Sequence, residues 1–313
     1  MKIKFWGVRG SIPTPLNSLQ LKSRISSIIN RIQPEDLKTP ETRETFLARL
    51  PSYLFGTVGG NTTCIEIDAG EKFCIIVDAG TGIRELGYYL AEEKKELKHF
   101  HIFLTHFHWD HIQGIPFFTP AFKKENRIYF YNPSSQLEDL LTAQMQPPYF
   151  PIAMDQIPAQ VNFVILLEHT LKLGDMNISW KKMKHPSSSY AYKFSKGGKN
   201  IVIATDSEIT EKEFVKSPEN IQFFSNIDLL VLDSQYTLRE SISKMDWGHS
   251  SYSMGVDLAS DWKVKTLVLF HHEPLYNDRK ILSIERTAKW YLERLEYKAV
   301  KVVIAMEGME LEV

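Results

Sequence analysis

The chain has 313 residues, of which 43% are hydrophobic and 24% charged, so it can bury a large core and has the composition of a soluble globular enzyme. Its 37 basic residues are balanced by 38 acidic ones, whereas nucleic-acid-binding proteins usually carry a basic excess. We therefore expect no large nucleic acid as a partner. No segment approaches about 18 apolar residues and the first residues do not resemble a signal peptide, which predicts a cytoplasmic protein with no membrane partner.

Strands and helices alternate along most of the chain. A strand at 2–8 precedes a segment at about 16–55, in which the patterns at 18–31 and 40–49 predict helices bounded by prolines. The later patterns predict strands at 63–67, 73–77, 127–131, 161–166, 176–183, 190–194, 200–204, 228–232 and 266–270. They predict helices at 83–97, 133–150, 250–260 and 281–295.

This order predicts an α/β fold in which two sheets pack together with helices outside them. The chain has no linker, low-complexity segment or short repeat, so we expect one domain over 1–313 with a helical insertion at about 16–55. Its two cysteines, Cys64 and Cys74, fall in neighbouring strands of a predicted hairpin, where facing positions would bring them close. Two cysteines in a chain of this length favour buried free thiols over a disulfide framework.

The most informative motif is Thr-His-Phe-His-Trp-Asp-His at 105–111, which directly follows an apolar run. It places His106, His108, Asp110 and His111 within one short loop at the end of a strand. Imidazole and carboxylate groups together are typical ligands of zinc, iron or manganese. Chance clustering of histidines is the alternative, but four ligand-type residues at this spacing favour a metal site.

Three later residues extend the predicted site. His185, Asp206 and His271 each follow the end of a strand-type run, where a rigid sheet can hold a loop in place. His272 is adjacent to His271, and the strand-then-histidine pattern favours His271 as the ligand. Each of the three alone could be an ordinary polar residue.

The spacing H-x-H-x-D-H and the order of the later residues resemble the metallo-β-lactamase superfamily, which implies a four-layered αββα sandwich. The resemblance implies two divalent metal ions, with zinc expected before manganese or iron. It assigns His106, His108 and His185 to one ion, and Asp110, His111 and His271 to the other, with Asp206 bridging. A hydroxide held between two such ions is the expected nucleophile.

A second motif, Gly248-His249-Ser250-Ser251, resembles the Gly-His-Ser-Thr segment of the ribonuclease Z and phosphodiesterase branch. The resemblance implies that His249 protonates or stabilises the leaving group and that Glu208 orients His249. Together with Asp110, these are the expected catalytic residues.

Five further residues are expected around the site. Asp78 ends a strand and, on the resemblance, orients a metal-binding histidine. Arg9, Ser11 and Asn61 resemble the opening of the same branch and are candidates to approach a phosphate, with turn formation and capping as the alternative. His272 is a candidate for supporting the metal site or contacting substrate.

These features predict a metal-dependent hydrolase, with a small phosphodiester such as a cyclic nucleotide as the first substrate. The chain lacks the Lys-rich arm with which ribonuclease Z members grip transfer RNA. Members of the branch tend to dimerise, so a homodimer is also expected from the resemblance. Two alternatives remain: a glyoxalase-like thioester hydrolase and a non-hydrolytic di-iron redox or sensor protein. The Gly-His-Ser-Ser motif argues against the thioester hydrolase. The intact early histidines argue against the di-iron protein.

Overall fold

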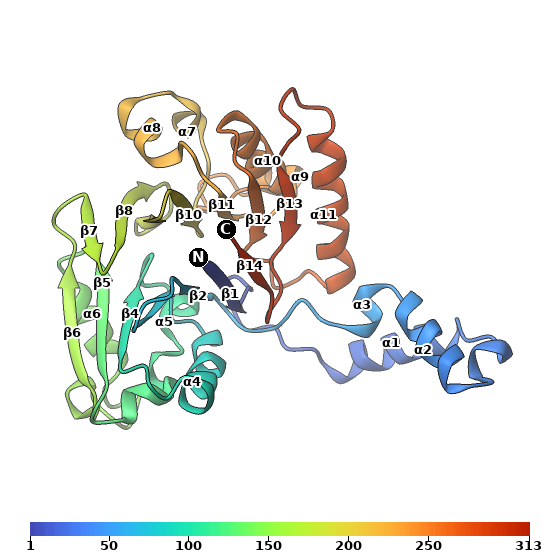
Figure 1. Cartoon of the computed structure of the whole chain (residues 1–313), viewed down its shortest axis with the longest axis horizontal. Helices are drawn as coiled ribbons and strands as arrows, with labels where there is room; N and C mark the ends of the chain where they lie inside the picture. The colour runs from blue at the N-terminus through green and yellow to red at the C-terminus, as the bar shows by residue number, and fades with distance from the viewer.

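Two seven-stranded sheets lie face to face in the computed structural model, which describes residues 1–313 apart from the side chain of Ser52 (Figure 1). The strands of the first sheet are, in spatial order, β14 (Glu310–Glu312), β1 (Lys2–Gly7), β2 (Cys64–Asp68), β3 (Cys74–Val77), β4 (His99–Phe103), β5 (Arg127–Asn132) and β6 (Gln160–Ile165). Those of the second are β13 (Lys301–Ile304), β12 (Thr266–Phe270), β11 (Leu229–Asp233), β10 (Lys199–Ala204), β9 (Ser189–Lys196), β8 (Met176–Met183) and β7 (Thr170–Leu173).

Helices cover the outer face of each sheet. The first sheet is covered by α4 (Gly82–Glu93) and α6 (Leu137–Gln144), and the second by α10 (Tyr252–Asp261) and α11 (Asp278–Leu292). Helix α11 buries Ile281, Ile284, Ala288 and Leu292, whose spacing forms one apolar stripe along the helix. The two sheets and two helical layers confirm the predicted αββα sandwich.

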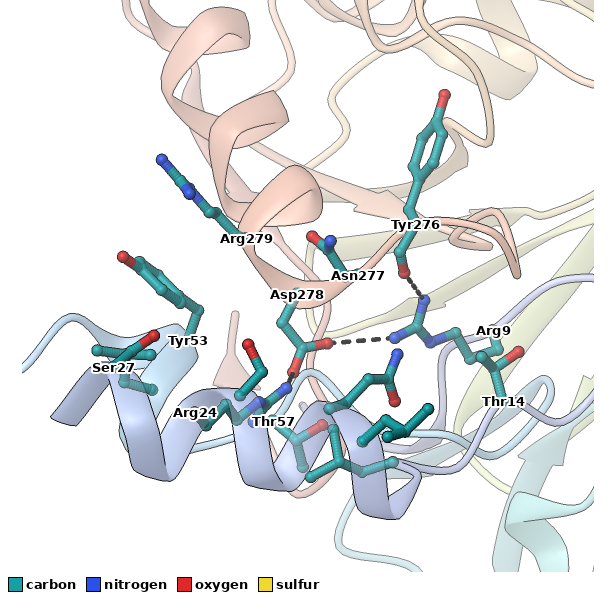
Figure 2. A pocket seen from close by; sticks show the side chains of 15 residues that line it. Arg9, Thr14, Arg24, Ser27, Tyr53, Thr57, Tyr276, Asn277, Asp278 and Arg279 are labelled. Carbon is teal, nitrogen blue, oxygen red and sulfur yellow. Dashed lines mark hydrogen bonds and ion pairs between the residues drawn. The ribbon is translucent and has the colours of Figure 1, made fainter. Parts of the chain in front are cut away.

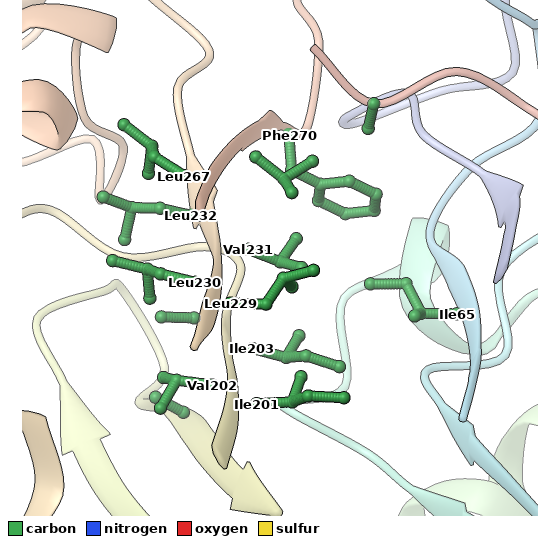
Figure 3. Packing of buried hydrophobic residues seen from close by; sticks show 14 of the residues in the cluster. Ile65, Ile201, Val202, Ile203, Leu229, Leu230, Val231, Leu232, Leu267 and Phe270 are labelled. Atoms are coloured by element: carbon green, nitrogen blue, oxygen red, sulfur yellow. The ribbon is translucent and has the colours of Figure 1, made fainter. Parts of the chain in front are cut away.

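Side chains point alternately to the two faces of a strand, so the second sheet can pack against a layer on each of its faces. Within β10, Ile201 and Ile203 point toward the first sheet and Ile65, whereas Val202 points to the opposite side (Figure 3). All four side chains are almost fully buried. The second sheet therefore presents apolar side chains on both faces, as expected of strands covered on both sides.

Several short elements connect these layers. The short helices are α5 (Trp109–Ile112), α7 (Glu211–Phe214), α8 (Pro218–Phe224) and α9 (Leu238–Ser243). The 3₁₀ turns are η1 (Pro34–Leu37), η2 (Ile115–Phe117), η3 (Thr119–Phe122) and η4 (Met154–Gln156).

The segment predicted to be helical at 16–55 holds α1 (Ser18–Ile29), α2 (Pro40–Arg49) and α3 (Ser52–Phe55). It extends away from the sheets in Figure 1, and neither α1 nor α2 contains a fully buried residue. A capping box at Asn17 begins α1, and Thr39 with a following proline begins α2.

Some elements differ from the sequence prediction. Strands β7, β13 and β14 and helices α7 to α9 were not predicted, and the helix expected at 133–150 is confined to Leu137–Gln144. Cys64 and Cys74 are free and buried, as expected. They do not face each other, because the β2–β3 register pairs Ile65 with Val77 and Ile67 with Ile75.

The directions of the strands determine at which edge of the sheets the candidate site lies. Strands β3, β4 and β5 run parallel in the first sheet, and β10, β11, β12 and β13 do so in the second. The carboxyl ends of parallel strands meet at one edge of a sheet, where loops can carry functional side chains. Among the described residues, no helix is both long and apolar enough to cross a membrane.

Candidate metal centre

The side chains predicted as metal ligands form two adjacent groups at the strand ends. One consists of His106, His108, His185 and Asp206, and the other of Asp110, His111, Asp206 and His271. Within each group, the candidate ligand atoms lie within 4.8 Å of one another. The structure therefore brings together all seven residues, although they come from four separate stretches of the chain.

Asp206 joins the two groups through its two carboxylate oxygens. Its Oδ2 lies 3.7 Å from Nε2 of His106 and 3.8 Å from Nε2 of His185. Its Oδ1 lies 3.1 Å from Nε2 of both His111 and His271. Each oxygen therefore faces a different group, which is the arrangement needed for a carboxylate shared between two cations.

The donor set fits divalent cations on its own chemistry. Nε2 of His106 and of His111 are buried and have no hydrogen-bond partner among the described residues. A buried polar atom without a partner is costly, and a cation bound at each group would satisfy the nitrogen of that group. Burial, and then the nearby His111, hold the pKa of His106 well below its ordinary range, so its imidazole is neutral and can donate a lone pair to a metal.

Asp78 orients His111. Its buried carboxylate accepts hydrogen bonds from the backbone N–H of Thr105 at 2.7 Å, from the Thr105 hydroxyl at 2.9 Å and from Nδ1 of His111 at 2.8 Å. The bond to Nδ1 fixes the ring so that Nε2 points toward Asp206 and Asp110. Asp78 thus lies where the sequence placed it, beside a candidate metal-binding histidine.

Three of the strand-end residues adopt left-handed backbone conformations. The φ angles of Asp78, Asp206 and His271 are +61°, +49° and +61°. Such angles are uncommon outside glycine and cluster at functional sites, where the surrounding structure holds them. The same abrupt turn after three different strands directs the three side chains toward one point.

Ser11 contacts the second group through its backbone. Its N–H donates a hydrogen bond of 2.7 Å to Oδ2 of Asp110, and its φ is +60°. Gly10, just before it, packs so closely on His271 that a Cβ there would lie 2.5 Å from the ring. This first loop therefore positions two candidate ligands, whereas the sequence suggested a phosphate contact for Ser11.

Gly248 positions His185. Its carbonyl accepts a hydrogen bond of 2.9 Å from Nδ1 of His185, and its φ of +87° lies in the region that favours glycine. A Cβ at this position would lie 2.3 Å from Nδ1 of the same ring. The glycine of the Gly-His-Ser-Ser motif is therefore required by close packing against a candidate ligand.

We expect Gly248→Ala to lower hydrolytic turnover by about a hundredfold, because a displacement of a reactive group by about 1 Å has an effect of that size. The added methyl group must displace the His185 ring and strain a left-handed backbone. Steady-state kinetics together with metal analysis would measure both effects. Gly197→Ala, at a position with a φ of +58° but no atom within 4 Å of the added Cβ, is the matched control for backbone strain. Equal losses in the two variants would contradict the packing explanation.

His249 lies beside both groups and is held by Asp233. Its Nδ1 donates a hydrogen bond of 2.6 Å to Oδ2 of Asp233. Its ring stacks on His271 with centroids 5.1 Å apart and meets His185 edge-on at 5.2 Å. Burial lowers the pKa of His249, but the Asp233 carboxylate outweighs this effect and raises the pKa to about 9. The free Nε2 can therefore carry a proton next to the candidate ligands.

The prediction that Glu208 orients His249 is wrong, because Asp233 occupies that position. Glu208 instead accepts hydrogen bonds from Nζ of Lys184 at 2.6 Å and from the backbone N–H of Gly248 at 3.1 Å. It supports the loop before His249 rather than the ring. Sequence reasoning missed Asp233, although it directly ends the run Leu-Leu-Val-Leu, the same signal that had identified Asp206.

Arg9 does not approach a phosphate, because its guanidinium is buried and its donors are used within the chain. It donates to the carbonyls of Gly59 at 2.8 Å and Tyr276 at 2.9 Å, and to Oδ1 of Asp278 at 3.2 Å. Figure 2 shows Asp278 between Arg9 and Arg24 in a pocket that lies where α1 meets the start of α11. Arg9 therefore joins separate segments of the chain.

Asn61 and His272 also have structural contacts rather than the predicted site contacts. The backbone N–H and side chain of Asn61 donate to Glu307 at 2.5 Å and 3.3 Å. Nε2 of His272 donates to the carbonyl of Ala305 at 2.9 Å, and burial lowers its pKa to about 3. His271, rather than His272, lies in the candidate metal centre.

Comparison with known proteins places these observations in context. A family model described as a β-lactamase superfamily domain matches residues 74–272. Ribonuclease Z of Streptococcus suis is 22% identical over 256 residues, which cover 67% of this chain and 81% of that protein. Ribonuclease Z of Clostridium tetani is 24% identical over 282 residues, which cover 72% of this chain and 89% of that protein.

Solved structures share the fold along the whole chain. The metallo-β-lactamase fold protein YhfI from Bacillus subtilis has a TM-score of 0.66 and 17% identity, and the match covers 100% of this chain and 98% of that one. The short form of human tRNase Z has a TM-score of 0.61 and 16% identity, with coverage of 100% and 99%. A diphosphatase from the PhnP family has a TM-score of 0.61 and 16% identity, with coverage of 100% and 97%. At such identities, the likeness shows a common fold.

The expectation that a large nucleic acid is excluded as a partner is wrong. The sequence relatives are ribonuclease Z proteins, and a structural neighbour is a tRNase Z, so proteins of this type act on nucleic acids. The expectation relied on the balance of 37 basic and 38 acidic residues. A net charge sums over the whole surface, whereas phosphates contact local groups, so a balanced total excludes nothing.

Proposed function

Because the chain belongs to the metallo-β-lactamase superfamily of hydrolases, we propose that it is a metal-dependent phosphodiesterase whose two cation sites share Asp206. The observation that carries this proposal is the division of the Asp206 carboxylate, with Oδ2 facing His106 and Oδ1 facing His111. Paired cations are common in enzymes that cleave phosphate esters, because they can clamp both the attacking and the leaving oxygen.

The proposed ligands favour a first-row transition metal. One site would use His106, His108 and His185, and the other Asp110, His111 and His271, with Asp206 common to both. Imidazole-rich sets suit zinc, manganese or iron better than magnesium or calcium, which prefer oxygen ligands. We propose zinc as the first metal to test. When bound, the cations would activate a water for attack and neutralise the charge on the phosphate oxygens.

The remaining steps depend on residues of the chain itself. The backbone N–H of Ser11 fixes Asp110, and Asp78 fixes His111, so the ligand atoms are oriented before substrate binds. The Nδ1–H of His249 is bonded to Asp233, whose carboxylate raises the pKa of the ring to about 9 and favours the doubly protonated form, which carries a second proton on Nε2. We propose that Nε2 gives this proton to the leaving oxygen, as a general acid does.

A phosphodiester is favoured over other bonds by two observations. The dyad of His249 and Asp233 lies beside both ligand groups, where a poor leaving group such as a sugar hydroxyl would need a proton. The sequence relatives are named as ribonucleases. The substrates to compare are therefore a cyclic nucleotide, suggested by the sequence motifs, and an RNA, suggested by the relatives.

Zinc-loaded protein is expected to hydrolyse bis(p-nitrophenyl) phosphate, with activity that a chelator removes and added zinc restores. Asp110→Ala is expected to lower turnover by about a thousandfold, because it removes a candidate ligand from the second group. Release of p-nitrophenolate measures the rate, and a cyclic nucleotide and a transfer RNA precursor are then compared as substrates. Chelator-resistant turnover, or a fully active Asp110→Ala variant, would contradict the proposal.

A further inference from the structure

A hollow of about 610 Å³ opens beside His249. Its lining includes Ser11, Gln235, Tyr236, Lys244, Trp247 and Glu273. His249 belongs to the same lining. The leaving group that accepts the proton of His249 would therefore enter this space. The hollow is of the size that small ligands or single nucleotides occupy.

Lys244 is held at this hollow by two aromatic rings. Its Nζ lies 4.1 Å from the centroid of the Tyr236 ring and 5.6 Å from that of the Trp247 ring. The Tyr236 ring in turn meets the His249 ring edge-on at 5.8 Å. One tyrosine ring therefore separates the ammonium group from the imidazole.

The chain positions Lys244 and His249 on one short connection. Lys244 caps helix α9, and its carbonyl accepts a hydrogen bond of 3.2 Å from the N–H of Trp247. Gly248 and His249 follow directly. The turn that fixes His249 between the two ligand groups therefore also fixes the lysine.

Lys244 has no ion-pair partner among the described residues, although acidic side chains line the same hollow. Asp246 pairs with Nζ of Lys184 at 2.7 Å. Glu273 accepts a hydrogen bond of 2.7 Å from Nε2 of Gln235. The nearby carboxylates thus have their own donors, and the ammonium group of Lys244 stays available to an anion in the hollow.

We propose that Lys244 binds a second phosphate of the substrate. This phosphate belongs to the leaving group, whose oxygen accepts the proton of His249. Lysine is a common point-charge partner of phosphate, and a nucleic acid strand carries a phosphate about every 3.4 Å of helix axis. The exposed Trp247 ring offers a surface on which the base between the two phosphates can stack. The site would therefore prefer esters with several phosphates in series over isolated diesters. This inference rests on the proposed phosphodiesterase function.

The test compares two competitors of bis(p-nitrophenyl) phosphate hydrolysis by the zinc-loaded full chain. One is a trinucleoside diphosphate and the other is the corresponding dinucleoside monophosphate, so they differ by one nucleoside and one phosphate. We expect the trinucleotide to inhibit about tenfold more strongly, because a charge-assisted contact has an effect of that size. Lys244→Gln should abolish this ratio, and Lys244→Arg should preserve it.

Lys280→Gln is the matched control, because Lys280 also lies over a tyrosine ring, 5.2 Å from the centroid of Tyr276, but outside the hollow. It should preserve the ratio of inhibition constants. An unchanged ratio in Lys244→Gln, or equal inhibition of the unaltered chain by both competitors, would overturn the role of Lys244. Absence of any metal-dependent diester hydrolysis would instead reject the proposed function itself, so the two failures are distinguishable.

Discussion

Replacement of Asp206 by asparagine is expected to lower phosphodiester turnover by roughly a thousandfold, which corresponds to about 4 kcal/mol of transition-state stabilisation. The carboxylate is common to both groups of candidate ligands, so its loss weakens both sites at once. Asparagine keeps the shape of the side chain but has one oxygen where the shared site needs two. Metal analysis should show that bound zinc falls together with activity.

Asp175→Asn provides the control, because Asp175 is exposed in the turn between β7 and β8, away from the candidate ligands. It should leave turnover and metal content unchanged. If Asp206→Asn retained its full complement of zinc, the shared-carboxylate arrangement would be rejected. If it retained activity, the site would not be the place of catalysis.

His249→Ala is expected to lower the hydrolysis of a nucleoside diester by about a thousandfold, within the range for loss of a general acid. The same change should lower hydrolysis of bis(p-nitrophenyl) phosphate far less, because p-nitrophenolate is a stable anion and leaves without a proton. Zinc content should stay the same, since His249 bonds Asp233 rather than completing either of the two ligand groups. Kinetics with both substrates would measure the difference.

Asp233→Asn is the companion variant, because it keeps the size of the residue that orients His249 but removes its charge. We expect turnover to fall less than in His249→Ala, and to fall more for the nucleoside diester than for bis(p-nitrophenyl) phosphate. Equal losses for both substrates in His249→Ala would show that the imidazole does not act as the proton donor. A loss of zinc would show that it is a metal ligand.

The ligands of the candidate metal centre could be proposed from sequence because their signals are local and their order resembles that of a known superfamily. Four candidate ligands lie in one loop, and His185, Asp206 and His271 each follow an apolar strand. Parallel strands bring such positions to one sheet edge without any knowledge of distant contacts. Asp78 was proposed from the resemblance, and it lies beside His111.

The errors arose where a side chain contacts residues far away in the sequence. Arg9 bonds to Tyr276 and Asp278, and Asn61 bonds to Glu307, partners that no local pattern reveals. Asp233 ends the buried strand β11, so its position at the strand end was predictable, whereas the resemblance implied Glu208. The choice between two acidic residues near one histidine depended on geometry.

The edges of the sheets were also hard to predict. Strands β13 and β14 are short, and each is completed by a partner from elsewhere in the chain: β14 pairs with β1 at the opposite end of the sequence. Their identity depends on that pairing more than on their own residues, because short strands have weak sequence signals. The buried central strands, in contrast, have continuous apolar runs.

The most direct test of a phosphodiesterase with two cations is a zinc titration of the metal-free chain, with turnover of bis(p-nitrophenyl) phosphate recorded at each ratio of zinc to protein. The proposal of two cations that clamp the ester predicts that activity rises until about two equivalents are bound and then stays constant. Full activity at one equivalent, or no turnover after two are bound, would contradict this account.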